Sequence, residues 1–290
     1  MGRRTVLVTG GSGGIGAAAV ERFVRGGDQV WFTYRNGRER AEELARRLST
    51  LTTTAAGGAH VQAFAFDQGE WNSHVDLIAR LPGPVDVLVN NAAVGSATVA
   101  DHAGSDEQAR DLAMFRINSV GPLWLIRQLL PGMLERGYGK VVNISSVNGG
   151  VTQFPGFLLS DGMSKAALAF MTRQLSAELA MSPVDVFAIC PGATETSMFE
   201  ASTLSRLNSG ERAQYVAGLP KGRLISPQEV AEVIWWLCGD AGQALHGAVV
   251  DASLGLGVHP GLLPHSDHSA PSEPQPPEPA TVPFAAERSA

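Results

Sequence analysis

Asp161 and Lys165 stand four residues apart in the segment LLSDGMSKAAL. The pattern from Ser164 onward predicts an amphipathic helix, and residues four apart in a helix lie on the same side. A carboxyl group one turn before an ammonium group raises the question of whether the carboxyl group is protonated and can donate a proton. An ordinary aspartic acid, with a pKa of about 3.9, is ionised near neutral pH, and a neighbouring lysine lowers the pKa of that acid further. A second interpretation is structural, because Ser160 and Asp161 precede the helix and can cap it.

A glycine-rich turn lies near the N-terminus, in VLVTGGSGGIGAAAVERF. Gly10, Gly14 and Gly16 follow a short apolar run and precede a helical pattern. Glycines lack the Cβ atom that would keep a phosphate away from the backbone, and the start of a helix offers free N–H groups and a positive dipole end. This order of strand, glycines and helix predicts a dinucleotide-binding site.

The second apolar run ends at a basic and polar tip that contains Arg35 and Asn36. An acidic residue there would accept a hydrogen bond from the ribose 2′-hydroxyl of NAD, whereas arginine can bind the 2′-phosphate of NADP. The tip therefore predicts NADP(H), and the alternative is an exposed basic start of a helix. Asp67, at the end of the third run, is expected to meet the adenine or to cap the next helix.

The elements that position these residues are short apolar runs in alternation with helical patterns. Most runs are continuous, which is typical of strands covered on both faces. The alternation predicts an α/β fold, a Rossmann-type doubly wound parallel sheet of about seven strands with helices on both faces. Predicted strands are 5–9, 29–33, 61–66, 85–89, 140–144, 184–189 and 248–250, and predicted helices are 15–26, 38–50, 71–80, 106–136, 164–182 and 227–239.

These elements fill a single domain over residues 1–258, and residues 259–290, with eight of the 17 prolines, predict a disordered tail. The net charge of −6, with basic residues gathered only at Arg35, Arg38 and Arg40, argues against nucleic acid as a partner. No apolar run approaches the ~18 residues that span a bilayer. No histidines or cysteines have metal-ligand spacing. Only two cysteines are present, which favours a reducing compartment and hence the cytoplasm.

Six motifs occur along the chain in a fixed order: TGGSGGIG at 9–16, NNAA at 90–93, RINSVGPL around Asn118, NISSVNG at 143–149, SKAAL at 164–168 and PGATET at 191–196. Together they resemble the short-chain dehydrogenase/reductase family. The resemblance covers residues 5 to about 255. It implies a Rossmann-type fold, hydride transfer with NAD(P), and a homodimer or homotetramer joined through the helices 106–136 and 164–182.

The resemblance also implies roles for individual residues. Lys165 would hydrogen-bond the nicotinamide ribose and Ser146 would polarise the substrate oxygen. Asn118 would bend its helix and hold a water molecule linked to Lys165. The cofactor contacts that we expect are Gly10, Ser12, Gly14, Ile15, Gly16, Arg35, Asn36, Asp67, Asn90, Ala92, Lys165, Pro191, Gly192, Thr194 and Thr196.

The chain departs from the family pattern at the proton donor, a tyrosine four residues before the lysine, where this sequence has Asp161. Burial in an apolar pocket would keep Asp161 protonated and able to act as the acid. Alternatively, the substrate needs no proton donor. Examples are a cationic iminium and a ketone whose carbonyl group is polarised by a hydrogen bond from its own adjacent phenol. A third interpretation is a non-redox protein of the same fold, either a cyclase or dehydratase with Asp161 as base or a ligand-binding protein.

The intact cofactor motifs favour the first two interpretations. We therefore predict a cytoplasmic, NADPH-dependent reductase of a ketone or an imine, with Asp161 in place of the tyrosine. The segment from Ser197 to Arg223 resembles the family's mobile lid. A bulky hydrophobic substrate is suggested by the apolar side chains of the lid and of the segment before Asp161, which are Met198, Phe199, Leu204, Tyr215, Phe154, Phe157 and Leu159.

Overall fold

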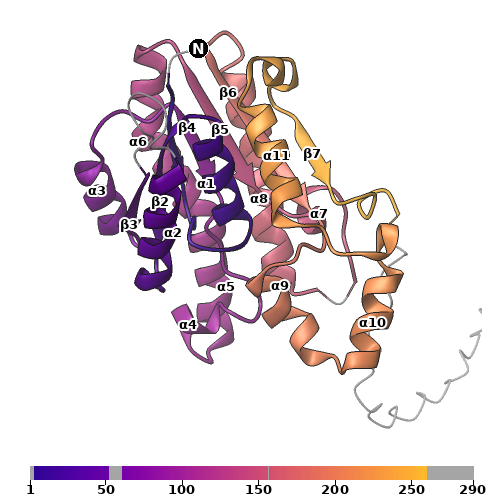
Figure 1. Cartoon of the computed structure of the whole chain (residues 1–290). Coiled ribbons are helices and arrows are strands. Elements are labelled where there is room, and N and C mark those ends of the chain that lie inside the picture. The colour runs from indigo at the N-terminus through magenta and orange to yellow at the C-terminus, as the bar shows by residue number, and fades with distance from the viewer. Residues whose placement is uncertain (1–2, 52–60, 156, 260–290) are drawn as a thin grey trace, which may run out of the picture.

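A parallel sheet forms the centre of the computed structural model, which describes residues 3–51, 61–155 and 157–259. Seven strands lie in the order β3-β2-β1-β4-β5-β6-β7, and every neighbouring pair is parallel (Figure 1). The strands are β1 (Thr5–Val8), β2 (Gln29–Tyr34), β3 (Val61–Ala65), β4 (Val87–Asn90), β5 (Gly139–Ile144), β6 (Val184–Pro191) and β7 (Val249–Ala252). The predicted fold class is confirmed. Apart from His259, the predicted tail lies outside the described residues.

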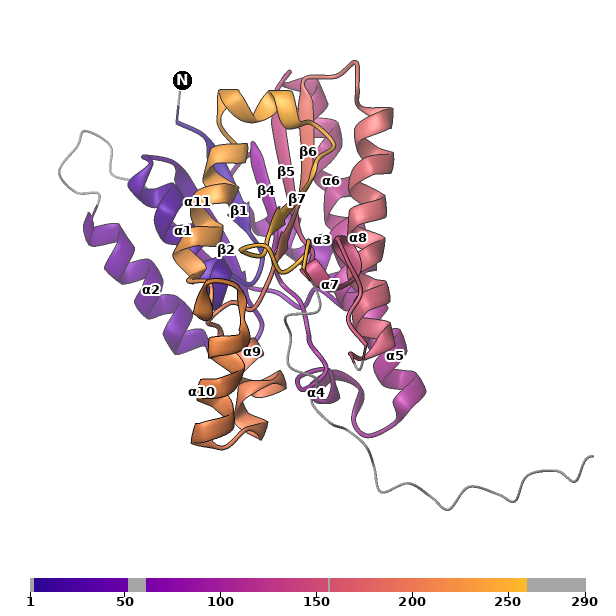
Figure 2. The same ribbon diagram turned by 90° about the vertical axis from the view of Figure 1, so that its right-hand side faces the viewer.

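Helices cover both faces of this sheet (Figure 2). The longer ones are α1 (Gly14–Arg25), α2 (Arg38–Leu51), α3 (Trp71–Arg80), α5 (Glu107–Phe115), α6 (Gly121–Glu135), α8 (Leu159–Glu178), α10 (Ser209–Gly218) and α11 (Pro227–Leu237). Shorter α-helices are α4 (Ala100–Ala103), α7 (Val147–Gly150) and α9 (Ser197–Ser202). Further short turns of helix are η1 (Arg116–Val120), η2 (Leu204–Arg206), η3 (Pro220–Gly222) and η4 (Asp240–Leu245).

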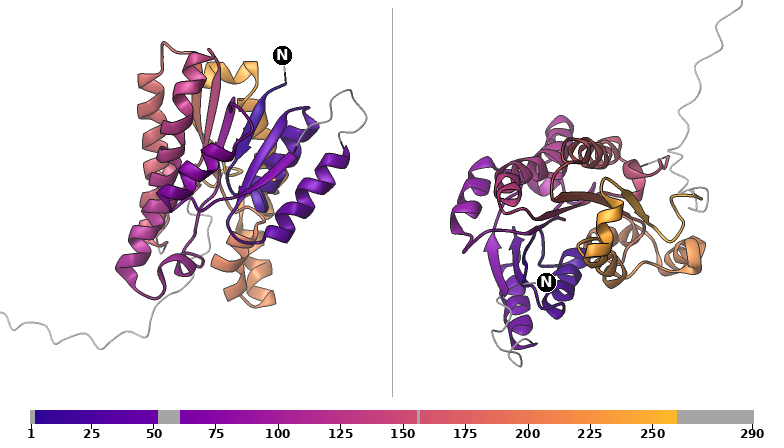
Figure 3. Two further views of the ribbon diagram at one scale, coloured as in Figure 1. Left: turned by 90° about the vertical axis from the view of Figure 1, so that its left-hand side faces the viewer. Right: turned by 90° about the horizontal axis from the view of Figure 1, so that it is seen from above.

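The two faces of the sheet bury separate hydrophobic cores. Along β1, Val6 and Val8 pack with α1, α2 and α11, whereas Leu7 packs with α3, α6 and α8 on the other side. Successive side chains of a strand point to opposite faces, so a strand covered on both sides is apolar throughout. This explains the continuous apolar runs of the sequence. The two layers of helices are seen from further directions in Figure 3.

Two predicted helices differ from the structure. The pattern over 106–136 contains α5, a π-helical turn (η1) and α6 rather than one helix. The helix predicted from residue 164 begins earlier, at Leu159, so Asp161 lies in its first turn. The spacing of apolar residues predicts neither the π-helical turn nor the early start of α8. An inserted residue, or a polar first turn, leaves the rest of the helical pattern intact.

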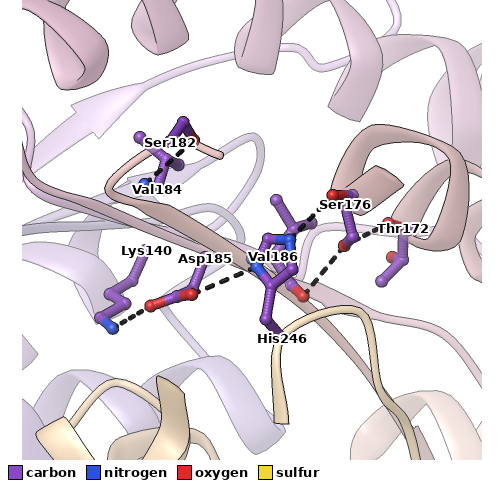
Figure 4. Close-up of polar contacts among 8 residues, drawn as sticks. All are labelled: Lys140, Thr172, Ser176, Ser182, Val184, Asp185, Val186 and His246. Carbon is purple, nitrogen blue, oxygen red and sulfur yellow. Dashed lines mark hydrogen bonds and ion pairs between the residues drawn. The ribbon is translucent and has the colours of Figure 1, made fainter. Parts of the chain in front are cut away.

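A cluster of polar and charged side chains, in part buried, lies where β5 and β6 begin (Figure 4). Lys140, only 1% exposed, donates from Nζ to the carboxylate of Asp185. The other oxygen of that carboxylate lies 3.1 Å from Nδ1 of His246. Nε2 of His246 lies 2.9 Å from the carbonyl oxygen of Ser176. The cluster therefore joins β5 and β6 to α8 and to the turn before β7.

We expect Asp185→Asn to destabilise the fold by about 3 kcal/mol, because the variant leaves the buried Lys140 ammonium without its counter-charge. Urea unfolding followed by circular dichroism measures this change. Asp76→Asn, on the exposed side of α3, is the matched control and should change stability by about 0.5 kcal/mol or less. Equal unfolding midpoints for the two variants would contradict the stabilising role of the cluster.

Candidate active site

The predicted site residues gather at one edge of the sheet, where β1, β4, β5 and β6 end. The carboxyl ends of parallel strands meet at such an edge, and ligands bind there at the point where the strand order reverses. In this chain the order reverses between β1 and β4. Gly10 follows β1, Asn90 ends β4, Ser146 follows β5 and Pro191 ends β6, while Lys165 reaches the same edge from α8.

The glycine-rich turn between β1 and α1 forms a cradle without side chains. Gly10 and Gly14 have φ values of +65° and +51°, which favour glycine. A Cβ atom on Gly16 would lie 2.3 Å from the carbonyl oxygen of Gly10. The N-cap of α1 is Gly13, which has no capping side chain, so the first N–H groups of the helix are available to an anion. The cradle therefore fits the pyrophosphate of a dinucleotide.

The end of β4 holds this cradle in place. Asn91 donates from Nδ2 to the carbonyl oxygens of Thr9 at 2.9 Å and Gly10 at 3.2 Å. The backbone N–H of Ala92 donates to Oγ1 of Thr9 at 2.9 Å. Asn91 was not among the predicted site residues, although the Asn90-Asn91 doublet in the sequence could have indicated it.

Asn90 is buried and connects the centre of the sheet to α8. Its Nδ2 donates to Oδ1 of Asn143 at 2.9 Å, and Asn143 donates to Oγ1 of Thr172 at 3.0 Å. Oδ1 of Asn90 is buried and has no hydrogen-bond partner within the described part of the chain. An acceptor that is buried without a partner is costly, and a ligand hydroxyl group would satisfy it.

Asn118 lies in the π-helical turn between α5 and α6, which directs its side chain inward. Its Oδ1 accepts from the backbone N–H of Val94 at 2.9 Å, and its Nδ2 donates to Val94 O at 2.9 Å. The same Nδ2 lies 3.1 Å from Oγ of Ser164, which itself donates to the carbonyl oxygen of Asp161 at 2.8 Å. Asn118 thus connects the segment after β4 to the first turn of α8.

Lys165 is buried beside the end of β5. Its Nζ donates to the carbonyl oxygen of Ile144 at 3.1 Å, and Ser145 Oγ donates to the carbonyl oxygen of Lys165 at 2.8 Å. Burial lowers the pKa of Lys165, and the nearby Asp161 opposes that shift. The ammonium group therefore has one protein acceptor in the described structure and can donate to a further group.

Asp161 occupies the first turn of α8, and the N-cap of this helix is Leu158, without a side-chain cap. The interpretation of Asp161 as the helix cap is therefore wrong. In the described structure the carboxyl group accepts no hydrogen bond and forms no salt bridge with Lys165. Burial raises the pKa of Asp161, while the charge of Lys165 opposes the rise. A partly buried carboxyl group without a partner is thus available to a ligand.

Ser146 caps the short helix α7, and its Oγ accepts from the backbone N–H of Asn148 at 3.2 Å. The helix packs closely against α8, since a Cβ atom on Gly149 would lie 2.1 Å from the carbonyl oxygen of Gly162. Gly149 has φ +87°, which favours glycine. This contact fixes the hydroxyl group of Ser146 close to the turn that carries Asp161.

Arg35 directly follows β2 and is held by two partners. Its Nε donates to the carboxylate of Asp67 at 3.0 Å, and its Nη1 lies 2.6 Å from Nε2 of His102. Asp67 also accepts from the N–H of Gly69, and the N-cap of α3 is Glu70. The interpretation of Asp67 as a helix cap is therefore wrong.

The segment after β6 lies across the glycine cradle. Oγ1 of Thr194 donates to the carbonyl oxygen of Gly192 at 3.0 Å. Thr196 caps α9 by accepting from Phe199 N at 3.2 Å, and a Cβ on Gly14 would lie 3.0 Å from Cγ2 of Thr196. The other predicted cofactor residues belong to the same edge: Ser12 is buried, Ile15 and Ala92 are partly buried, Pro191 is buried and Asn36 is exposed.

The predicted apolar side chains lie before and in α8 and in the segment after Thr196. The rings of Phe154 and Phe157 lie 5.7 Å apart, and those of Phe199 and Tyr215 lie 6.3 Å apart. Leu159 and Met198 are exposed, whereas Leu204 is 2% exposed and therefore packs within the lid. The segment from Ser197 to Arg223, which the resemblance implies to be a lid, consists of α9, η2, α10 and η3.

The described part of the chain contains no group of three residues that could hold a metal ion. No described helix combines the length and the apolar character that crossing a bilayer requires.

Comparison with known proteins gives one family throughout. The family model described as short chain dehydrogenase matches residues 4–206. The acetoacetyl-CoA reductase of Allochromatium vinosum is 33% identical over 259 residues, which cover 88% of this chain and 99% of that protein. The 3-oxoacyl-(acyl-carrier-protein) reductase of Aquifex aeolicus is 30% identical, over 86% and 96% of the two chains.

Solved structures agree with these relatives. A variant of the actinorhodin polyketide ketoreductase in complex with NADPH has a TM-score of 0.76 and 30% identity, over 88% of this chain and 97% of the other. A gluconate 5-dehydrogenase from Beutenbergia cavernae with bound NADP has a TM-score of 0.74 and 27% identity, over 87% and 96%. The fold, the glycine cradle and these matches lead to one conclusion: the chain is an oxidoreductase of the short-chain dehydrogenase family.

Proposed function

We propose that this protein is an NADPH-dependent reductase of a C=O or C=N group, in which Asp161 acts at the position of the usual tyrosine. The observation that carries the proposal is the partly buried carboxyl group of Asp161, unpaired within the described structure, one turn before the buried Lys165. NADPH, when bound, supplies the hydride. The residues of the chain must then position the substrate and provide for the charge that develops on its reacting heteroatom.

For a ketone, the protonated form of Asp161 is the useful one. Burial raises the pKa of this carboxyl group, and a neutral carboxylic acid can donate a proton to a developing alkoxide. The hydroxyl group of Ser146 donates a hydrogen bond to the same oxygen. Lys165 would hold the cofactor ribose through its Nζ group. Ketoreductases among the relatives support this version.

For an imine, the ionised form of Asp161 is the useful one. An iminium carbon accepts hydride without a proton donor, and a carboxylate nearby stabilises the cation. The absence of a salt bridge between Asp161 and Lys165 in the described residues supports this second version, because the carboxylate would be free to pair with the substrate.

The substrate that we propose is bulky and hydrophobic. Exposed apolar side chains near the first turn of α8 and on the lid support it, namely Phe157, Leu158, Leu159, Met163 and Met198. The two cysteines are free and buried, and the cytoplasmic location that we propose agrees with free thiols.

We also propose a homodimer or homotetramer that uses α5, α6 and α8. Leu112 on α5 is 72% exposed and Phe170 on α8 is 70% exposed, and both lie on the outer surface of the molecule. Large apolar side chains on neighbouring helices are typical of surfaces that a partner covers.

Titration with NADPH, followed by the fluorescence of the cofactor, tests the redox proposal. We expect saturable binding and oxidation of the bound NADPH by hydrophobic ketones or by cyclic imines, because the glycine cradle is free of side chains. A chain that binds neither NADPH nor NADH would contradict every reductase version and leave the non-redox cyclase, dehydratase or binding protein.

The pH dependence of kcat/KM at saturating NADPH separates the two substrate classes. If protonated Asp161 is the acid, kcat/KM for a ketone is highest at low pH and falls as pH rises through the raised pKa of this group. If ionised Asp161 stabilises an iminium, kcat/KM rises through the same interval. Asp161→Asn should remove this dependence of kcat/KM on pH and lower kcat/KM by about 10²-fold or more. Full activity with an unchanged profile in Asp161→Asn would rule out a role in proton chemistry.

Phe170→Asp should shift the protein toward the monomer in sedimentation velocity, because a carboxylate in the centre of an apolar interface is costly to bury. Met181→Asp is the control, since Met181 is 100% exposed just beyond the end of α8. An unchanged sedimentation coefficient for Phe170→Asp would place the interface elsewhere.

A further inference from the structure

The arginine at the tip of β2 is not the most available cation beside the cofactor cradle. Arg35 forms its salt bridge with Asp67, and a further N–H of its guanidinium group lies against His102. Burial and the charge of Arg35 both lower the pKa of His102, so its ring is the acceptor of that contact. The carboxylate of Asp67 neutralises the charge of Arg35. The pair therefore distinguishes poorly between a ribose with a doubly charged 2′-phosphate and a ribose without one.

Arg40, in the first turn of α2, lies closer to the cradle. A Cβ atom on Gly13 would be 3.8 Å from Cζ and from Nη2 of Arg40. A Cβ atom on Gly37 would be 3.3 Å from the same Nη2. The guanidinium group therefore extends over the N-cap of α1 on one side and over the turn after β2 on the other.

The guanidinium group of Arg40 has no direct partner in the described part of the chain. Within residues 3–51, 61–155 and 157–259 its side chain forms no salt bridge and no hydrogen bond. It lines a cavity of about 550 Å³ together with Gly13 and Gly14. Glu21, which lines the same cavity, is already paired with Arg25 and Arg47.

The other charged groups of the cavity wall come from distant parts of the chain. Arg212 is paired with Glu200 through two hydrogen bonds of 2.7 and 2.8 Å, whereas the carboxylate of Glu195, in the segment after β6, forms no salt bridge within the described residues. Of the three arginines that line this cavity, Arg40, Arg47 and Arg212, Arg40 is thus the one without a partner among the described residues.

The position of this cation matches the position of the phosphate that distinguishes NADP from NAD. In a dinucleotide fold the ribose 2′-oxygen faces the tip of the second strand, one step from the glycine-rich turn. Gly37 is three residues beyond the end of β2 and Gly13 is the N-cap of α1, so both glycines border that location. Neither has a side chain that would occupy the space next to the guanidinium group.

We propose that Arg40, rather than Arg35, binds the 2′-phosphate and determines the preference for NADPH over NADH, while the pair of Arg35 and Asp67 flanks the adenine. This inference rests on the proposed function, because it requires that the chain binds a nicotinamide dinucleotide. A guanidinium group offers a planar fork of N–H donors to a phosphate, and such charge-assisted hydrogen bonds are stronger than neutral ones.

The test measures the Kd of NADPH and of NADH by fluorescence for the full-length protein and for three matched variants. Arg40→Gln should weaken NADPH binding at least tenfold and leave the Kd of NADH within about twofold. Arg35→Gln should weaken both cofactors to a similar degree, because its effect falls on the adenine that they share. Arg46→Gln, on the exposed side of α2 and paired with Glu43, should change neither.

The outcomes separate this inference from the proposed function. A wild-type protein that binds neither cofactor refutes the proposed function and the inference together. A wild-type protein that prefers NADPH, with a preference that Arg40→Gln leaves intact, refutes the inference alone. Loss of the preference in Arg35→Gln and not in Arg40→Gln would assign the 2′-phosphate to Arg35 instead.

Discussion

The burial of Lys165 next to a carboxyl group with which it forms no salt bridge is the constraint on which the candidate site depends. Removing both groups from water disfavours their charged forms, and a direct ion pair would have offset part of that cost. The fold instead gives the ammonium group a backbone acceptor at Ile144 and leaves the carboxyl group open. The two groups are therefore held apart, each with capacity for a ligand.

This arrangement depends on contacts that the rest of the fold provides. Asn118 fixes the first turn of α8 through Ser164, and Ser145 fixes the backbone of Lys165. The Asn90–Asn143–Thr172 chain holds α8 against the centre of the sheet. The groups that would meet the substrate and the cofactor therefore lie on rigid elements, while the entrance and the lid are formed by short helices and turns.

The sequence was sufficient for the fold and for the edge at which the site lies, because the continuous apolar runs and the glycine-rich turn are local patterns. It was not sufficient for the contacts of individual side chains. The pairing of Arg35 with Asp67 joins residues 32 positions apart, and the clamp from Asn91 to Thr9 joins residues 82 apart. The start of α8 at Leu159 was missed because the first turn has no capping side chain to mark it.

The π-helical turn at Arg116–Val120 has a consequence for how the surface of the protein can change. A helix rotates by about 100° per residue, so one additional residue turns α6 out of phase with α5. Loss of that residue by deletion would rotate one helix against the other and turn Asn118 away from Val94. Substitutions on the outer surfaces of the two helices are free of this restriction. In this chain a deletion between α5 and α6 would therefore disturb the contact of Asn118 with Val94, whereas a single substitution on the outer surface would not.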